Sequence, residues 1–258
     1  MTIPPPQPSP DWAYFLDVDG TLIDIAQTPD EVFVDHDLLR LIEKLHLLCE
    51  GAVALVSGRA LADLDILLGM PHLPMAGLHG LEWRVNNTDD IQRRAMPTNE
   101  LDAIKLRLTT LRQRFDQLII EDKGSALALH YRQAPRLGSY LHRWVRDLVN
   151  LAGKDLQVQP GKRVIEIMSK GYDKGSAIET FMAQMPFADR LPVFIGDDLT
   201  DEHGFTVINQ MGGLSIKVGK GHTAATCRLR SVAAVRNWLS QLSAPNELRN
   251  RESTIAVT

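Results

Sequence analysis

The sequence predicts an α/β protein, a doubly wound parallel-sheet core with an inserted α+β cap domain, from three observations. Short apolar segments alternate with helical patterns over residues 12–79, and the same alternation returns over residues 192–242. Strand–helix–strand order of this kind favours parallel strands joined by right-handed crossovers. Between these halves, over about residues 84–168, helices are instead followed by pairs of strands, which is typical of an α+β insertion.

Each element of the parallel layer follows from a local pattern. Residues 12–16 (WAYFL) are apolar throughout and end at Asp-Val-Asp-Gly-Thr, as expected of a strand buried on both faces. Residues 36–50 carry leucine and isoleucine at helical spacing, and Gly51 predicts the end of that helix. The other predicted elements are strands at 52–56, 75–79, 192–196 and 214–218 and helices at 60–68, 200–209 and 231–242.

The inserted segment repeats a helix and a strand pair. A hairpin turning on Asn86-Asn87 is predicted at its start, next to Trp83, for which we expect a contact at the hinge. The further predicted elements are helices at 98–115 and 137–151 and strands near 117–121, 126–132, 156–159 and 163–168. The chain is thereby divided into a flexible N-terminal tail (1–10), a discontinuous core (11–83 and 169–243), the cap (84–168) and a C-terminal tail (244–258).

Composition narrows the classes of function. With 258 residues, of which 44% are hydrophobic and 23% charged, the chain is long enough for a full core and a smaller second unit. A formal net charge of −4 without a polybasic cluster argues against nucleic acid and anionic membranes as partners. Cys49 and Cys227 lack metal-ligand spacing and are expected to be free thiols. Because the sequence has neither a signal peptide nor an apolar run of membrane length, we expect a cytoplasmic protein.

Reactive side chains follow three of the predicted strands at the same edge of the sheet. The carboxyl ends of strands in an open parallel sheet form the crevice where ligands bind. Converging carboxylates repel one another unless a cation lies among them, and hard oxygen ligands favour Mg²⁺. The sequence therefore predicts a magnesium site at this edge. The residues are Asp17 and Asp19 after the first strand, Ser57 after the second, and Asp197, Asp198 and Asp201 after a late strand.

The order of four motifs narrows the chemistry. DVDGT (17–21), Ser57, Lys174 within DKGSAI, and GDDLTD (196–201) follow one another at the expected ends of elements. Taken singly, each also fits a plain structural role as a turn, a solvated lysine or a helix cap. Together they resemble the motifs of the haloacid dehalogenase-like (HAD) phosphotransferases. That resemblance implies a HAD-like core and a phosphatase that uses Mg²⁺.

The resemblance implies a role for each matching residue. Asp17 would attack phosphorus and carry the phosphoryl group, and Asp19 would act first as general acid and then as general base. Ser57 and Lys174 would hold phosphoryl oxygens. The ligands of Mg²⁺ would be Asp17, the backbone carbonyl of Asp19, and Asp197, with Asp198 and Asp201 in support.

A closer resemblance covers residues 11–242 and concerns the trehalose-phosphatase family. It is carried by YFLDVDGTL, ALVSGRAL, AGLHGLE (76–82), ALHYR (128–132), VIEI (164–167) and VFIGDDLTDE (193–202). It implies hydrolysis of trehalose 6-phosphate, the last step of trehalose biosynthesis. It also implies a functional link to a trehalose-phosphate synthase.

Residues that contact the sugar are expected in the cap. Strand alternation in ALALHYR separates two sets of side chains: Leu127, Leu129 and Tyr131 toward the cap helices, and Ala126, Ala128, His130 and Arg132 on the open face. An open face of small residues beside charged ones suits a polar disaccharide. The resemblance implies sugar contacts by Glu121, Lys123, Arg132 and Glu166, and the expected substrate-binding set also includes His130, with His79 and Arg59 from the core.

The same residues are also compatible with plainer roles, and the function has two alternatives. Charged side chains on a solvated sheet also form surface salt bridges, His79 also fits a packed histidine, and Arg59 also fits a brace within its loop. The nearest alternative function is a HAD phosphatase for another sugar phosphate, such as sucrose phosphate or mannosyl-phosphoglycerate. A non-catalytic sugar-phosphate sensor is the second alternative, although Asp17 and Asp19, which a sensor would not need, are both present.

Overall fold

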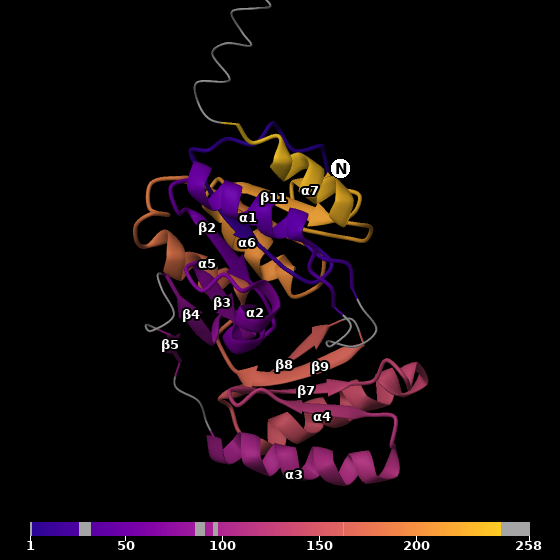
Figure 1. Ribbon diagram of the computed structural model, residues 1–258. Helices are drawn as coiled ribbons and strands as arrows, with labels where there is room; N and C mark the ends of the chain where they lie inside the picture. Colours follow the sequence, from indigo (N-terminus) through magenta and orange to yellow (C-terminus); the bar gives the residue numbers. More distant parts are fainter. Residues whose placement is uncertain (1, 26–31, 86–90, 95–97, 162, 244–258) are drawn as a thin grey trace, which may run out of the picture.

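The computed structural model describes residues 2–25, 32–85, 91–94, 98–161 and 163–243, which form a core and a cap (Figure 1). The core is built on an eight-stranded sheet of order β12-β11-β10-β1-β2-β3-β4-β5. Strands from β12 to β3 are parallel, and β4 and β5 add an antiparallel edge. The strands are β1 (Trp12–Leu16), β2 (Val53–Val56), β3 (Met75–Gly77), β4 (Glu82–Arg84), β5 (Gln92–Arg93), β10 (Leu191–Gly196), β11 (Leu214–Val218) and β12 (Cys227–Leu229).

Helices cover both faces of this sheet, as the doubly wound prediction requires. One face carries α1 (His36–Leu48), α2 (Leu61–Leu68) and α7 (Val232–Ser240), and the other carries α5 (Lys174–Met182) and α6 (Asp201–Gln210) (Figure 1). The helix predicted to end at Gly51 ends at Leu48, with Cys49 as its C-cap. Glu50 and Gly51 follow with φ of +52° and +87°, and the N–H of Gly51 donates to the carbonyl of His46 in the last turn of α1. None of the helices in the described ranges combines the length and the apolar character of a bilayer span.

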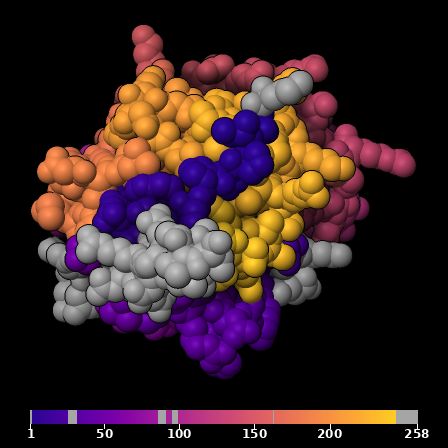
Figure 2. All heavy atoms as spheres, turned by 90° about the horizontal axis from the view of Figure 1, so that it is seen from above, coloured from indigo at the N-terminus to yellow at the C-terminus, as the bar shows by residue number. Residues whose placement is uncertain are grey.

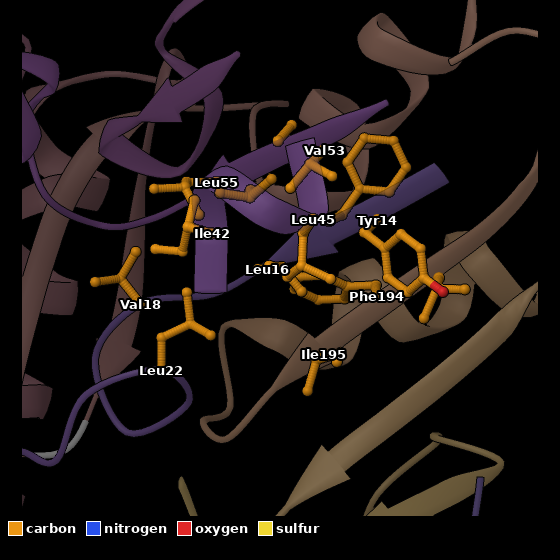
Figure 3. Close-up of a cluster of buried hydrophobic side chains, with 14 of the residues drawn as sticks. Tyr14, Leu16, Val18, Leu22, Ile42, Leu45, Val53, Leu55, Phe194 and Ile195 are labelled. Carbon is orange, nitrogen blue, oxygen red and sulfur yellow. The ribbon is translucent and has the colours of Figure 1, made fainter. Parts of the chain in front are cut away.

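The middle strands are buried on both faces. Residues 13–16 of β1 and all four residues of β2 are at most 1% exposed. Figure 3 shows side chains of β1, β2 and β10 packed together with those of α1. Because β1 lies between β2 and β10 in the middle of the sheet, the residues that directly follow it are held by the best-packed part of the molecule.

The cap packs two helices against one face of a four-stranded antiparallel sheet of order β6-β7-β9-β8. Leu127, Leu129 and Tyr131 face the cap helices as predicted, since all three are buried in a cluster with Leu108 and Leu141. The other face of the sheet is turned toward the core (Figure 1). The elements of the cap are α3 (Thr98–Arg114), β6 (Ile119–Asp122), β7 (Ala126–His130), the 3₁₀ turn η3 (Pro135–Leu137), α4 (Gly138–Ala152), β8 (Leu156–Gly161) and β9 (Val164–Ser169).

The border between core and cap differs from the predicted one at residue 84. Strands β4 and β5 extend the core sheet, with Glu82 paired to Gly77 on one side and to Arg93 on the other. The cap therefore begins with α3. Alternation in the sequence predicts that two strands pair, but it does not say which sheet receives the pair. The predicted turn at Asn86-Asn87 lies outside the described residues.

Residues 2–10, which the sequence assigns to a flexible N-terminal tail, lie against the core in the structure. Ile3 forms a parallel bridge with Cys227 of β12, and the indole Nε1 of Trp238 in α7 donates to the carbonyl of Pro6 at 2.7 Å. Figure 2 shows this N-terminal strap, residues 2–10, lying across the C-terminal part of the core. Proline-rich composition predicts an extended chain, but an extended chain can also dock along a sheet edge. The predicted C-terminal tail lies outside the described residues.

Arg94, in the segment that leads from the core into the cap, contacts the core strand β4 and the segment that leads back from the cap. The guanidinium carbon of Arg94, just after β5, lies 4.4 Å from the ring centre of Trp83 and 5.0 Å from that of Tyr172, just after β9. Arg94 Nη2 also donates to Thr180 Oγ1 at 3.1 Å. The hinge contact expected of Trp83 is therefore present, and we call this group the hinge clamp.

Deleting residues 2–8 is expected to lower the thermal unfolding midpoint, because the deletion uncovers β12 and leaves the indole of Trp238 without its acceptor. We expect a loss of about 1–3 kcal/mol in the free energy of unfolding, measured by thermal and urea denaturation. For comparison, Trp238→Phe removes the same hydrogen bond and also leaves a gap where the buried indole packs, so it should cost about 1–3 kcal/mol. An unchanged midpoint in the deletion variant would show that the strap contributes nothing to stability.

Candidate active site

The loop after β1 carries the central carboxylate. The backbone N–H of Asp17 donates to the carbonyl of Ile195 in β10 at 3.0 Å, and the residue is only 4% exposed. Gly20 turns the loop with φ +84°, and a Cβ at this position would lie 2.3 Å from Asp197 Oδ2. Glycine therefore allows the loops after β1 and β10 to approach each other, which brings Asp17 and Asp197 together.

A buried lysine joins two carboxylates. Lys174 is the first residue of α5, whose N-terminus is closed by reciprocal hydrogen bonds between Asp173 and Ser176. Its Nζ donates to Asp17 Oδ1 and to Asp201 Oδ1, both at 2.6 Å. Burial lowers the pKa of Lys174, but the attraction of the two carboxylates outweighs burial, so the pKa lies above its ordinary value. Lys174 is thus an ammonium ion at the base of the site.

The donor set fits a divalent cation. Carboxylate oxygens of Asp17, Asp197 and Asp201 lie within 4.8 Å of one another, and all three residues are buried. Burial raises the pKa of Asp17; Lys174 opposes this rise, while Asp201 and Asp197 add to it. Carboxylates this close together repel one another, so a hard cation among them would be stabilising, and oxygen ligands of this kind favour Mg²⁺.

Asp19 is held by Arg59. The Nε and Nη2 atoms of Arg59 donate to the two carboxylate oxygens of Asp19, each at 2.7 Å. The backbone N–H of Arg59 donates to the buried Ser57 Oγ at 3.1 Å. Burial lowers the pKa of Arg59, and its hydrogen bonds to Asp19 raise it above the ordinary value overall. Arg59 therefore braces the Ser57 loop, which is one of the two roles expected of it, and also lines the cleft described below.

Charged residues on the open face of the cap sheet meet the core. Lys123 Nζ donates to Glu166 Oε1 at 2.7 Å, and His79 Nε2 lies 2.5 Å from Glu166 Oε2. Burial raises the pKa of Glu166, but the charges and hydrogen bonds of His79 and Lys123 outweigh burial and hold the pKa below its ordinary value. Beside this group, His130 Nε2 lies 2.7 Å from Glu121 Oε2, and this hydrogen bond lowers the pKa of Glu121.

A cleft of about 920 Å³ lies between the core and this face of the cap. A volume of this order is typical of sites for small molecules. Of the residues predicted for the site, Asp201 alone does not line the cleft, because it lies fully buried behind Lys174. The predicted residues that line it are Asp17, Asp19, Ser57, Arg59, His79, Glu121, Lys123, His130, Arg132, Glu166, Lys174, Asp197 and Asp198.

Two further residues of the site were not predicted from the sequence. Thr21 Oγ1 donates to Asp17 Oδ2 at 2.9 Å, so the last residue of DVDGT holds the first. Lys217 is buried in β11, and its Nζ donates to the backbone carbonyls of Asp197 and Val218. A lysine within the apolar run LSIKV was an available signal, because a buried lysine requires partners.

The fold and the site define a class of protein. A doubly wound parallel core with an acidic cluster at its strand ends and an inserted cap above that cluster is the architecture of HAD-like phosphotransferases. The family model described as trehalose-phosphatase matches residues 15–233. The chain belongs to the trehalose-phosphatase family and is therefore a phosphoric monoester hydrolase.

Individual relatives agree with this family. The chain is 40% identical to the trehalose-6-phosphate phosphatase of Escherichia coli K12, over 92% of this chain and 89% of that protein. It is 39% identical to a probable trehalose-phosphate phosphatase of Sinorhizobium fredii, over 91% and 89%. Its fold is similar to the C-terminal domain of a Candida albicans trehalose-6-phosphate phosphatase, with a TM-score of 0.78 at 22% identity, over 88% of this chain and 90% of that one.

Lys174→Met is expected to destabilise the core strongly, because it leaves Asp17 and Asp201 buried without their cation. We expect a loss of about 3–5 kcal/mol in the free energy of unfolding, measured by urea denaturation in the presence of a chelator. Lys220→Met, the same change at an exposed lysine, serves as control and should cost less than about 0.5 kcal/mol. Equal stability of the two variants would contradict the central role of the Lys174 ion pairs.

The contribution of Glu166 to stability should depend on pH. Its folded-state pKa is depressed, so the stabilisation is present above the ordinary glutamate pKa, about 4.3, and is lost as pH falls through the folded-state value. We therefore expect the difference in unfolding midpoint between the wild type and Glu166→Gln to be largest near pH 6–7 and to shrink progressively below about pH 5. A difference that does not change with pH would mean that the carboxylate charge is not what His79 and Lys123 stabilise.

Proposed function

We propose that this protein hydrolyses trehalose 6-phosphate to trehalose and phosphate, in a Mg²⁺-dependent reaction that passes through a phosphorylated Asp17. The observation that carries the proposal is the placement of Asp17. It lies buried where the cleft meets the core sheet, while the polar face of the cap borders the same cleft. A phosphate ester whose phosphoryl group lies at Asp17 would have its alcohol portion against the cap.

In the first step, a carboxylate oxygen of Asp17 forms a bond to phosphorus, and the bond from phosphorus to the sugar oxygen breaks. The leaving oxygen takes a proton from Asp19. Thr21 and Lys174 orient the nucleophile through the two oxygens of its carboxylate. Ser57 and Lys174 hold oxygens of the transferred phosphoryl group and offset its charge.

In the second step, Asp19 takes a proton from water as the water oxygen bonds to phosphorus. The bond from phosphorus to Asp17 breaks, which releases phosphate and restores the carboxylate. The two hydrogen bonds that Arg59 donates fix the orientation of the Asp19 carboxylate in the cleft, where it faces the water in this step.

The metal site would consist of Asp17, Asp197 and the backbone carbonyl of Asp19. Asp201 supports it through Lys174 and through the hydrogen bond that its Oδ2 accepts from the backbone of Asp198. Bound Mg²⁺ would supply positive charge that favours attack by an anionic carboxylate on an anionic phosphate. Lys217 would keep the loop that carries Asp197 in place.

Recognition of the disaccharide is assigned to the cap. Hydroxyl groups of a sugar need both donors and acceptors, and the cap offers Glu121 and Glu166 as acceptors with Lys123 and Arg132 as donors. His130, paired with Glu121, extends this polar face. Binding energy from the part of the substrate that does not react can in this way assist the chemical step.

The test is release of phosphate from trehalose 6-phosphate, sucrose 6-phosphate, glucose 6-phosphate and p-nitrophenyl phosphate, each with and without Mg²⁺. We expect Mg²⁺-dependent hydrolysis with a marked preference for trehalose 6-phosphate. Asp17→Asn should reduce kcat by about three orders of magnitude or more, because it removes the nucleophile. Asp24→Asn, the same change at an exposed position in the same loop, is the matched control.

The outcomes separate the parts of the proposal. Equal turnover of all four compounds would keep the mechanism and reject the assignment of the sugar site. A preference for another sugar phosphate would favour that alternative function. Tight binding of trehalose 6-phosphate without turnover by the wild type would favour a sensor. Activity retained in Asp17→Asn would reject the phosphorylated intermediate.

A further inference from the structure

A histidine of the core holds a carboxylate of the cap. His79 lies in the 3₁₀ turn η2 (Leu78–Gly80) of the core and Glu166 in β9 of the cap, with 2.5 Å between Nε2 and Oε2. Both side chains are less than one-tenth exposed. Lys123 donates to Glu166 Oε1 at 2.7 Å and also to the carbonyl of Gly58 in the core at 2.9 Å. A buried ionic group therefore joins the two domains at the cleft.

The backbone around His79 is specialised for this contact. Leu78 and His79 have φ values of +50° and +56°, in the left-handed region that side chains other than glycine rarely adopt. Such a conformation persists only where neighbouring contacts hold it. The N–H of His79 donates to the carbonyl of Ser57 at 3.0 Å, and that of Leu78 to the carbonyl of Arg59 at 2.9 Å. Backbone hydrogen bonds to residues 57–59 thus stabilise the left-handed conformation of η2.

Gly58 lies directly against the imidazole. A Cβ on Gly58 would be 2.8 Å from both Cε1 and Nε2 of His79, which is closer than real contacts of this type. A side chain at residue 58 would displace the nitrogen that meets Glu166. One short loop consequently reaches both ends of the cleft. Ser57 and Arg59 lie at the proposed phosphate end. Gly58 lies next to His79 and accepts a hydrogen bond from Lys123 at the proposed sugar end.

We propose that His79 is a positioning residue for sugar recognition. It acts through Glu166, whose carboxylate it orients for a sugar hydroxyl, and it can do so only while the cap is seated on the core. This inference rests on the proposed function and deepens it. The sequence predicts that His79 binds substrate, but in the structure its Nε2 is engaged by Glu166. A carboxylate offers about four lone-pair positions, so Glu166 keeps acceptor capacity toward the cleft that it lines.

Two variants of His79 carry the same amide group and differ by one methylene. Asparagine tolerates the left-handed backbone but is too short to replace Nε2, whereas glutamine extends far enough to donate to Glu166. We expect His79→Asn to lower kcat/KM for trehalose 6-phosphate by about 10- to 100-fold, and His79→Gln to recover most of that loss. The loss with p-nitrophenyl phosphate, which has no sugar, should be at least about tenfold smaller. Equal losses on both substrates would overturn the proposal.

A double-mutant cycle separates positioning from direct contact. If His79 acts through Glu166, His79→Asn should cause no further loss of kcat/KM in the Glu166→Gln background. If the loss of kcat/KM in the double variant equals the product of the two single losses, His79 acts on the substrate independently of Glu166, and the proposal is overturned. Gly58→Ala should reproduce the substrate-selective loss of His79→Asn, because it displaces the same nitrogen.

Different measurements test this inference and the proposed function, so the failure of one can be distinguished from the failure of the other. The substrate panel with the wild type tests the proposed function alone, and the cycle is then run with whichever sugar phosphate is preferred. The same cycle measured on thermal unfolding midpoints needs no substrate. Coupling between His79 and Glu166 in the midpoints would support the contact even in a protein without turnover. Additive midpoints would remove the basis of the inference.

Discussion

Lys174 places one ammonium group between Asp17, after the central strand, and Asp201, at the start of α6. Three segments far apart in the sequence meet there, and without this cation their carboxylates would repel one another. The close approach also depends on glycines, since a Cβ at Gly196 would lie 2.3 Å from Asp201 Cγ. The orientation of the Asp17 carboxylate, the assembly of the acidic cluster and the packing of α5 on α6 all depend on this one buried charge.

Much of the core site could be predicted because it lies at strand ends. Apolar runs identify buried strands, and parallel strands bring their carboxyl ends to one edge, so Asp17, Ser57 and Asp197 could be grouped from spacing alone. The pairs Arg59–Asp19 and His79–Glu166 could not, since they join residues 40 and 87 positions apart across loops and domains. The N-terminal strap and the β4–β5 pair were misassigned because local patterns do not identify the partner of an edge strand.

The two domains share the site unequally. The core supplies Asp17, Asp197 and Lys174 at the ends of buried strands and at the start of α5, whereas the cap supplies the polar face on the other side of the cleft. Residues 57–59 connect these parts, and the hinge clamp of Arg94, Trp83 and Tyr172 ties the two connecting segments together. The hinge clamp therefore lies where the two connecting segments meet, which is the place where a rotation of the cap would turn.

The position of β1 in the sheet has a consequence for synthesis of the chain. One neighbour of β1, the strand β2, follows early, but the other, β10, leaves the ribosome only after the whole cap. At ordinary rates of translation the delay is on the order of ten seconds or more. The cap is contiguous in sequence and has its own apolar cluster, and all of it is synthesised while the core sheet is still incomplete. Until β10 is synthesised, the edge of β1 that pairs with it has unpaired backbone N–H and C=O groups. An unpaired strand edge can pair with other chains, so the nascent chain is exposed to aggregation at this stage.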